Sequence, residues 1–196
     1  PRGYQFGSNG LYPQELNQFV TKSPLHNAIL NLKKLLTVGN GYSIEGAEQL
    51  GMKDKITLTQ LTNQFDGCIN ELAMDLFIHS RICLKVTWND DNTKILKVKR
   101  ISPDKIRIND VNAEMEAINY LYNWDWVYYT KYPIIKYPKF DQANKAEKVQ
   151  LLQYQVESPG MRLYAEPSYQ SALNWIILDA EMSNYHRSNI VNSINP

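Results

Sequence analysis

The stretch SALNWIILDAEM, residues 171–182, decides how this chain must be built. Read as a helix, it places large apolar side chains on several sides of its first half. At 3.6 residues per turn one narrow stripe cannot hold them all: Leu173, Trp175, Ile176, Ile177 and Leu178. We expect a helix from about Ser168 to Asn192 that needs burial on more than one face, within the chain or against another copy.

A second long apolar helix is predicted from about Leu58 to Ser80. Its apolar residues follow the 3/4 spacing of a helix: Leu58, Leu61, Phe65, Cys68, Leu72 and Leu76. At 1.5 Å per residue this rod is about 35 Å long.

A shorter helix precedes it in the first 40 residues. Ser23 is a suitable N-cap, Pro24 fits the first turn, and Gly39 and Gly41 favour a helix end. The apolar face is expected at Leu25, Ala28, Ile29, Leu32, Leu35 and Leu36.

The segment between the two long helices is β-rich, which predicts the α+β class. The runs ICLKVTWN (82–89) and TKILKVKRI (93–101), separated by polar turn residues 90–92, predict a hairpin. Further strands are expected in AINYLYNWDW (117–126), WVYYTKY (126–132) and LLQYQV (151–156), broken by Pro133, Pro138 and Pro159. Residues 140–147 are polar and predict an exposed loop.

Composition restricts the function classes without choosing one. The chain has 196 residues, 43% of them hydrophobic, a net charge of +1 and two cysteines without metal-ligand spacing. These cysteines favour a reducing, intracellular origin. No signal peptide opens the chain, and its longest uncharged run near the end is too short to span a membrane. Because it starts at Pro1 without a methionine and stops at NSINP, we expect a segment of a longer protein.

The sequence offers no catalytic constellation. The histidines His26, His79 and His186 lie apart, with no further ligand at metal spacing. Phosphate-binding, dinucleotide-binding and nucleophile-elbow motifs are absent from the sequence. No catalytic, cofactor-binding or metal-binding residue is predicted, and an enzyme is the weaker class.

Charge is distributed unevenly along the chain. Residues 81–107 hold eight basic residues against three aspartates, a net charge of +5, whereas the two long helices carry five acidic residues against Arg187. The hairpin could meet phosphate or an acidic protein. Equally, the alternation in KILKVK is typical of an ordinary solvated strand face.

Two runs resemble a known family. LYPQELNQFVTKSPLHNAILNLKKLLTVGNGY (residues 11–42) and YAEPSYQSALNWIILDAEMSNYHRSNIVNSINP (residues 164–196) resemble portal proteins of tailed bacteriophages, closest to those of crAss-like phages and related prophages. The chain departs from the family pattern at FIHSRI, where glycines are common, and at Ser193-Ile194, which replaces Gly-Phe.

The resemblance implies a fragment of the portal fold. Residues 1–56 would form the N-terminal part of the wing, residues 57–80 one stem helix and residues 81–166 the clip. Residues 167–196 would be the other stem helix and the start of the return to the wing. Portal subunits form homo-oligomeric rings, typically of twelve copies, at one capsid vertex of the virion, and are assembled in the bacterial host cytoplasm. Their partners are the terminase large subunit, the tail adaptor, the major capsid protein and double-stranded DNA, which passes through the channel without sequence specificity.

On this interpretation the apolar faces of the two rods meet neighbouring copies, which bury them. The expected stem interface is Leu61, Phe65, Leu72, Leu76, Leu173, Trp175 and Ile176, and the expected channel-lining residues are Asn184, Arg187 and Ser188. The acidic excess of the rods suits a wall along which DNA slides. Docking of motor or adaptor, or contact with DNA, is expected at Lys94, Lys97, Lys99 and Arg100.

Two alternatives remain open. The first is a monomeric nucleic-acid-binding or processing domain that uses the basic hairpin 81–107. The second is a monomeric helical layer that the rest of a longer chain covers.

Overall fold

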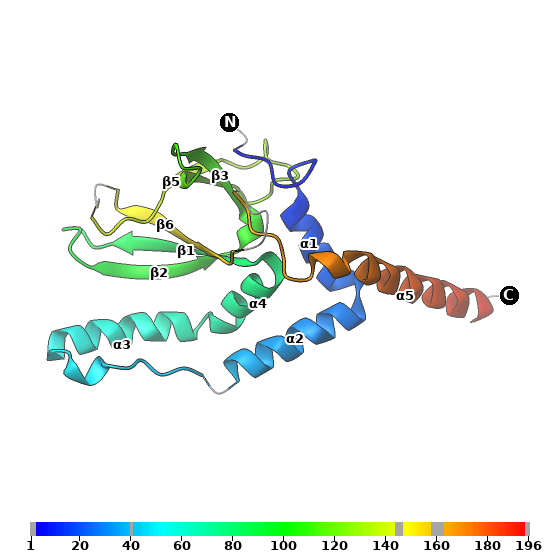
Figure 1. Cartoon of the computed structure of the whole chain (residues 1–196), viewed down its shortest axis with the longest axis horizontal. Coiled ribbons are helices and arrows are strands. Elements are labelled where there is room, and N and C mark those ends of the chain that lie inside the picture. The colour runs from blue at the N-terminus through cyan, green and yellow to red at the C-terminus, as the bar shows by residue number, and fades with distance from the viewer. Residues whose placement is uncertain (1–2, 40, 144–146, 158–162, 195–196) are drawn as a thin grey trace.

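A layer of helices carries two small antiparallel sheets (Figure 1). The computed structural model describes residues 3–39, 41–143, 147–157 and 163–194. In that part of the chain the helices are α1 (Tyr12–Lys22), α2 (Pro24–Val38), α3 (Met52–Asp66), α4 (Ile69–His79) and α5 (Leu173–Ile194). The strands are β1 (Arg81–Trp88), β2 (Ile95–Ile101), β3 (Ile106–Val111), β4 (Ala117–Tyr122), β5 (Ile135–Pro138) and β6 (Val149–Gln155). The α+β prediction is confirmed.

The predicted hairpin supplies two strands of the first sheet, whose order is β2-β1-β6, with β1 in the centre and β2 at one edge. Strand β1 pairs antiparallel with β2, with Val86 opposite Val98. In the turn, Asn92 has a φ of 52°, and the side-chain oxygen of Asn89 accepts hydrogen bonds from the backbone N–H groups of Thr93 and Lys94. Polar turn residues therefore close this hairpin by hydrogen bonding to their own backbone.

The second sheet, of order β3-β4-β5, was only partly predicted. The expected strand over residues 126–132 is wrong: those residues form turns, which Asn123 organises by donating its side-chain amide to the carbonyls of Tyr129 and Tyr132. Strands β3 and β5 were not predicted. The latter ends at Pro138, whose ring cannot donate to a ladder.

The predicted rod over residues 58–80 is broken into two helices. Helix α3 ends at Asp66, Gly67 caps it, and α4 begins at Ile69 after Cys68, whose φ of −135° is not helical. Glycine has low helix propensity and is a common site of kinks. The prediction of one continuous rod is therefore wrong, although the apolar spacing runs through the break.

Two expectations at the helix starts are tested by the same structure. The Ser23 side chain accepts a hydrogen bond from the N–H of His26, which confirms the predicted cap of α2. Helix α5 begins at Leu173 after a short 3-10 turn over Gln170–Ala172, five residues later than expected. Helix α1, which precedes α2, was not predicted as a separate helix.

The predicted loop at 140–147 lies partly outside the described residues, as does Pro159. Residues 141–143 and Glu147 are exposed, but the ring of Phe140 stacks on that of Trp88 with centroids 5.9 Å apart. This aromatic pair anchors the start of the segment to strand β1.

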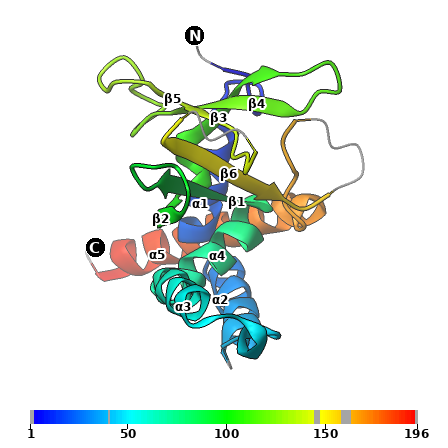
Figure 2. The same ribbon diagram turned by 90° about the vertical axis from the view of Figure 1, so that its left-hand side faces the viewer.

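Two buried clusters hold the elements together. One joins the two sheets and the N-terminal segment and contains Phe6, Cys83, Ile106, Ile108, Tyr120, Leu151 and Tyr164. The other joins α1, α2 and α4 through Leu16, Val20, Leu30 and Ile78. Helix α5 starts against this helical cluster and extends away from the body to the C-terminal end of the described chain (Figures 1 and 2).

Candidate functional site

The apolar stripe predicted on α2 faces solvent. Its buried side chains are His26 and Leu30, which belong to a different stripe, whereas Leu36 is 78% exposed. The exposed apolar residues of α2 are Leu25, Ile29, Leu32, Leu35 and Leu36. Spacing had predicted a face that needs burial, and the structure leaves that face uncovered in the isolated chain.

Helix α5 carries further exposed apolar side chains. Trp175 is 73% exposed beside α2, and the exposed apolar residues further along are Ile177, Leu178, Met182, Tyr185, Ile190 and Val191. We call the exposed apolar residues of α2 and α5 together the helical apolar surface. Exposed apolar patches are typical of protein-protein contact sites.

The predicted stem-interface residues do not share one environment. Leu72 and Ile176 are buried within the chain, each less than 10% exposed. Leu61, Phe65, Leu76 and Leu173 are half-buried, and among the seven only Trp175 is exposed. The three residues predicted to line a channel are all exposed on the outer half of α5: Asn184, Arg187 and Ser188.

A pocket of about 310 Å³ lies where α5 starts against α2. Its apolar walls include Ile29, Leu30, Ala172, Trp175 and Ile176. The fold builds this contact through a polar clamp: Ser23 Oγ donates to Asp179 Oδ2 over 2.6 Å, and the N–H of Leu25 donates to the same oxygen over 3.3 Å. One carboxylate of α5 thus holds the N-terminus of α2, where negative charge is favoured.

One residue that lines this pocket, His26, has a buried polar atom without a partner. His26 is 5% exposed, and its Nε2 is buried without a hydrogen-bond partner. Its ring packs edge-on against Tyr169, with centroids 4.4 Å apart. Burial and, to a smaller extent, the Lys33 ammonium lower the pKa of His26, so the imidazole is neutral at pH 7. The sequence had indicated only that His26 is a surface or packing residue and not a metal ligand, and no sequence signal marked the unpartnered nitrogen.

The basic hairpin is less available than its sequence suggested. Arg100 donates two hydrogen bonds of 2.6 Å to the carboxylate of Asp75 on α4. The side chain of Asp75 is 4% exposed and that of Arg100 29%. Arg100 is therefore engaged within the chain, and its expected contact with a partner stays a prediction, whereas Asp75 is a buried carboxylate and not part of an acidic wall.

Two more arginines of the basic segment are buried. The guanidinium of Arg81 lies over the rings of Phe6 and Tyr164, and that of Arg107 donates to four oxygens of the surrounding backbone and Gln14. Lys94, Lys97 and Lys99 remain exposed. The hairpin therefore presents lysines, while its arginines hold the fold together.

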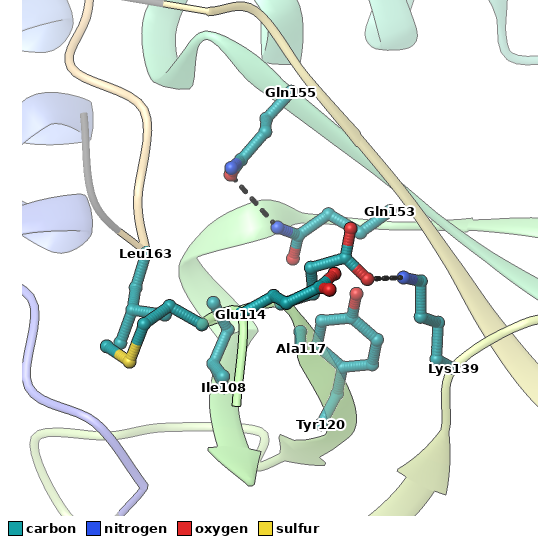
Figure 3. Close-up of a pocket in the computed structure, with 10 residues that line it drawn as sticks. Ile108, Glu114, Ala117, Tyr120, Lys139, Gln153, Gln155 and Leu163 are labelled. Atoms are coloured by element: carbon teal, nitrogen blue, oxygen red, sulfur yellow. Dashed lines mark hydrogen bonds and ion pairs between the residues drawn. The ribbon is translucent and has the colours of Figure 1, made fainter. Parts of the chain in front are cut away.

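A polar cavity of about 630 Å³ lies between the β3–β4 turn and β6 (Figure 3). Lys139 forms an ion pair of 3.6 Å with Glu116, and Gln153 donates to Gln155 over 3.2 Å. Burial raises the pKa of Tyr120, so its hydroxyl is protonated at neutral pH. These groups provide no activated acid, base or nucleophile in this cavity.

Within the described ranges, no group of three or more His, Cys, Asp or Glu residues could hold a metal ion. No helix in that part of the chain is long and apolar enough to cross a membrane.

The fold and its most prominent surface define an α+β chain with an uncovered apolar helical layer. No protein-family model matches the chain, and neither does any curated protein.

Proposed function

We propose that this chain is part of a portal subunit of a tailed bacteriophage, one copy in a ring at the capsid vertex through which double-stranded DNA passes. The observation that carries the proposal is the helical apolar surface. A ring of identical copies buries such a surface on every subunit, because each copy offers one face to each neighbour. The apolar surface supports a ring of copies, and the sequence resemblance is the reason for proposing that this ring is a portal.

The magnitude of the burial supports assembly. Fully burying one Leu or Ile side chain contributes roughly 1.5–3 kcal/mol. The surface contains twelve exposed apolar side chains on the two helices, so even partial cover is large compared with the stability of a domain of this size.

In the proposed virion, the terminase large subunit and the tail adaptor dock at the β-rich segment, and the major capsid protein surrounds the ring. Lys94, Lys97 and Lys99 are the exposed cations that suit docking to an acidic partner. Replacing Lys97 and Lys99 by Glu is expected to weaken terminase binding without changing the mass of the ring. Unchanged terminase binding would mean that these lysines have no docking role and form an ordinary solvated strand face.

The monomeric nucleic-acid-binding alternative has weaker support. Of the eight basic residues in 81–107, Arg81 and Arg107 are buried and Arg100 is paired with Asp75. Phosphate binding depends on the number of accessible cations. The remaining lysines make a modest patch.

Light scattering on the full-length chain tests the proposal. A ring-sized mass is expected, and Trp175→Glu is expected to reduce it because the substitution places a charge in the apolar contact. Tyr128→Glu is the matched control, since Tyr128 is a similarly exposed aromatic residue in the loop after β4. A monomer at all concentrations, or equal effects of both substitutions, contradicts the proposal.

A further inference from the structure

A cleft lies between the two sheets. The cavity of Figure 3 forms one part of it, and a second cavity of about 620 Å³ shares Glu116, Ala117 and Lys139 with the first. One wall comes from the β3–β4 turn and β4, and the other from β6 and the segment between β5 and β6. We call the two adjoining cavities together the inter-sheet cleft.

Carboxylates dominate the charge of the inter-sheet cleft. Four exposed acidic residues line it: Glu114 and Glu116 in the β3–β4 turn, and Asp141 and Glu147 in the segment between β5 and β6. Lys139 is the single cation among the lining residues that the structure describes. Because the whole chain has a net charge of +1, this is a local excess of negative charge, which attracts a cationic group.

The β3–β4 turn holds two of these carboxylates in place. The side-chain oxygen of Asn112 accepts hydrogen bonds from the N–H groups of Glu114, over 3.0 Å, and Glu116, over 2.8 Å. The Asn112 amide and Lys139 both contact Oε2 of Glu116, over 3.3 and 3.6 Å. Within the described chain, Oε1 of Glu116 and the carboxylate of Glu114 have no hydrogen-bond or ion-pair partner. These oxygens are available to a ligand.

A buried hydroxyl points into the same space. Tyr120 on β4 is 3% exposed, and its hydroxyl has no hydrogen-bond partner among the described residues. Figure 3 shows Tyr120 directed into the cavity, near Gln153 and Lys139. Unlike His26 Nε2, this hydroxyl is not among the fully enclosed polar atoms. Since an unmet buried polar group is costly, the hydroxyl marks a position where a polar group of a ligand is stabilised.

The lining groups accept more hydrogen bonds than they donate, which favours a cation with many donors. Carboxylates only accept, and Gln153 already donates its side-chain N–H to Gln155. A guanidinium has five N–H donors and no acceptor, and its planar fork can bond to carboxylates in pairs. An ammonium is a compact, strongly hydrated charge with three donors, so it satisfies fewer of these acceptors.

We propose that the inter-sheet cleft binds an arginine side chain from a basic segment of a partner protein. The guanidinium lies between the carboxylates of Glu114 and Glu116 and donates to the hydroxyl oxygen of Tyr120. This inference goes beyond the proposed function, which gives the β-rich segment only a lysine face for an acidic partner. The cleft belongs to one chain, so the inference does not depend on a ring.

Lys139 does not block this site. Its ion pair with Glu116 is 3.6 Å long, and both side chains are about half exposed. Exposed ion pairs contribute little to stability. An incoming guanidinium can therefore replace the ammonium of Lys139, which then moves into solvent.

Nuclear magnetic resonance titration of the full chain, labelled with nitrogen-15, tests the proposal with Nα-acetyl-arginine amide as the probe. The side-chain amide signal of Gln153, which lines the cleft, is expected to shift as the probe is added. The citrulline derivative has nearly the same shape but no charge, and it is expected to bind roughly 10-fold more weakly. The lysine derivative is expected to bind several-fold more weakly than the arginine derivative.

Three variants locate the binding. Glu114→Gln is expected to weaken binding of the arginine derivative roughly 10-fold, because it removes one charge-assisted contact. Tyr120→Phe is expected to weaken binding several-fold, and it should leave the fold intact because it removes no hydrogen bond within the described chain. Glu48→Gln makes the same charge change at an exposed glutamate outside the cleft and is the control.

The inference is overturned if the Gln153 amide does not shift, if arginine and citrulline derivatives bind equally, or if Glu48→Gln weakens binding as much as Glu114→Gln. Equal binding of the arginine and lysine derivatives also overturns it, because negative charge alone then explains the binding. None of these results depends on whether copies of the chain form a ring. The inference and the proposed function can therefore fail separately.

Discussion

The ion pair between Arg100 and Asp75 offers the sharpest test of how the hairpin is attached to the helices. Two hydrogen bonds of 2.6 Å join the guanidinium on β2 to the carboxylate on α4. Burial raises the pKa of Asp75 to about 6, while the bonds from Arg100 act in the opposite direction. Replacing Arg100 by Met removes the hydrogen bonds and the charge that lower the pKa of Asp75, and it keeps most of the side-chain volume.

The magnitude follows from burial. Removing one partner of a buried pair costs about 3–5 kcal/mol. The Arg100 side chain is 29% exposed, so solvent screens the pair in part and the lower end of that range applies. We expect Arg100→Met to lower the free energy of unfolding by about 3 kcal/mol at pH 8. Lys97→Met, on the same strand and exposed, should stay within about 0.5 kcal/mol.

The cost should depend on pH in a defined direction. The folded-state pKa of Asp75, about 6, lies above its ordinary value of 3.8, so its contribution to stability is fully present below pH 3.8 and is lost as the pH rises through 6. Without Arg100 the pKa rises further, and the variant keeps its proton where the native chain loses one. The penalty should therefore grow above pH 6.

Urea unfolding followed by circular dichroism at pH 5 and pH 8 measures both effects. A penalty below about 1 kcal/mol at pH 8, or an equal penalty at the two pH values, would refute the reasoning. The first result would mean that the pair contributes little to stability, and the second that the ionisation of Asp75 does not govern its contribution.

Four further substitutions test local features of the fold by the same unfolding measurement. Ser23→Ala removes the cap of α2 and the bond to Asp179 and should cost about 1–2 kcal/mol, whereas Thr21→Ala nearby should cost little. Gly67→Ala should raise stability by about 0.4–1 kcal/mol, because φ is −63° and an added Cβ meets nothing closer than 3.7 Å. Gly7→Ala should instead lower stability, since φ is +82° and the Cβ would lie 2.7 Å from that of Tyr12. Asn123→Ala should cost roughly 2–4 kcal/mol and change tryptophan fluorescence, because the amide holds the loop that contains Trp124 and Trp126.

Local chemistry was the predictable part of the fold. The Ser23-Pro24 pair marked the start of α2, and the polar turn at 90–92 marked the hairpin, since both depend on residues close in sequence. The break at Gly67 was missed because Phe65, Cys68 and Leu72 continue the apolar spacing across it. Spacing reports which side chains share a face, but it does not report whether the backbone bends between them.

That Arg100 needs a partner within the chain could have been inferred from the sequence, but the sequence analysis did not infer it. On a strand, side chains alternate between the two faces, so Arg100 shares a face with Leu96 and Val98, not with Lys97 and Lys99. A charge on the apolar face of a strand needs a partner. The partner itself, Asp75, lies 25 residues away on a helix, and only the folded chain brings the two together.

The helical apolar surface shows what sequence periodicity cannot predict, namely which face of a helix the fold buries. Spacing predicted one apolar face on α2, yet the chain buries His26 and Leu30 and leaves that face exposed. Leu30 packs with Leu16, Val20 and Ile78 in the helical cluster, and Asp179 accepts hydrogen bonds from Ser23 and Leu25 at the start of α2. Together these contacts orient α2 so that Leu32 and Leu36 are exposed. Spacing marks which side chains share a stripe, but contacts with residues distant in sequence decide which stripe is buried.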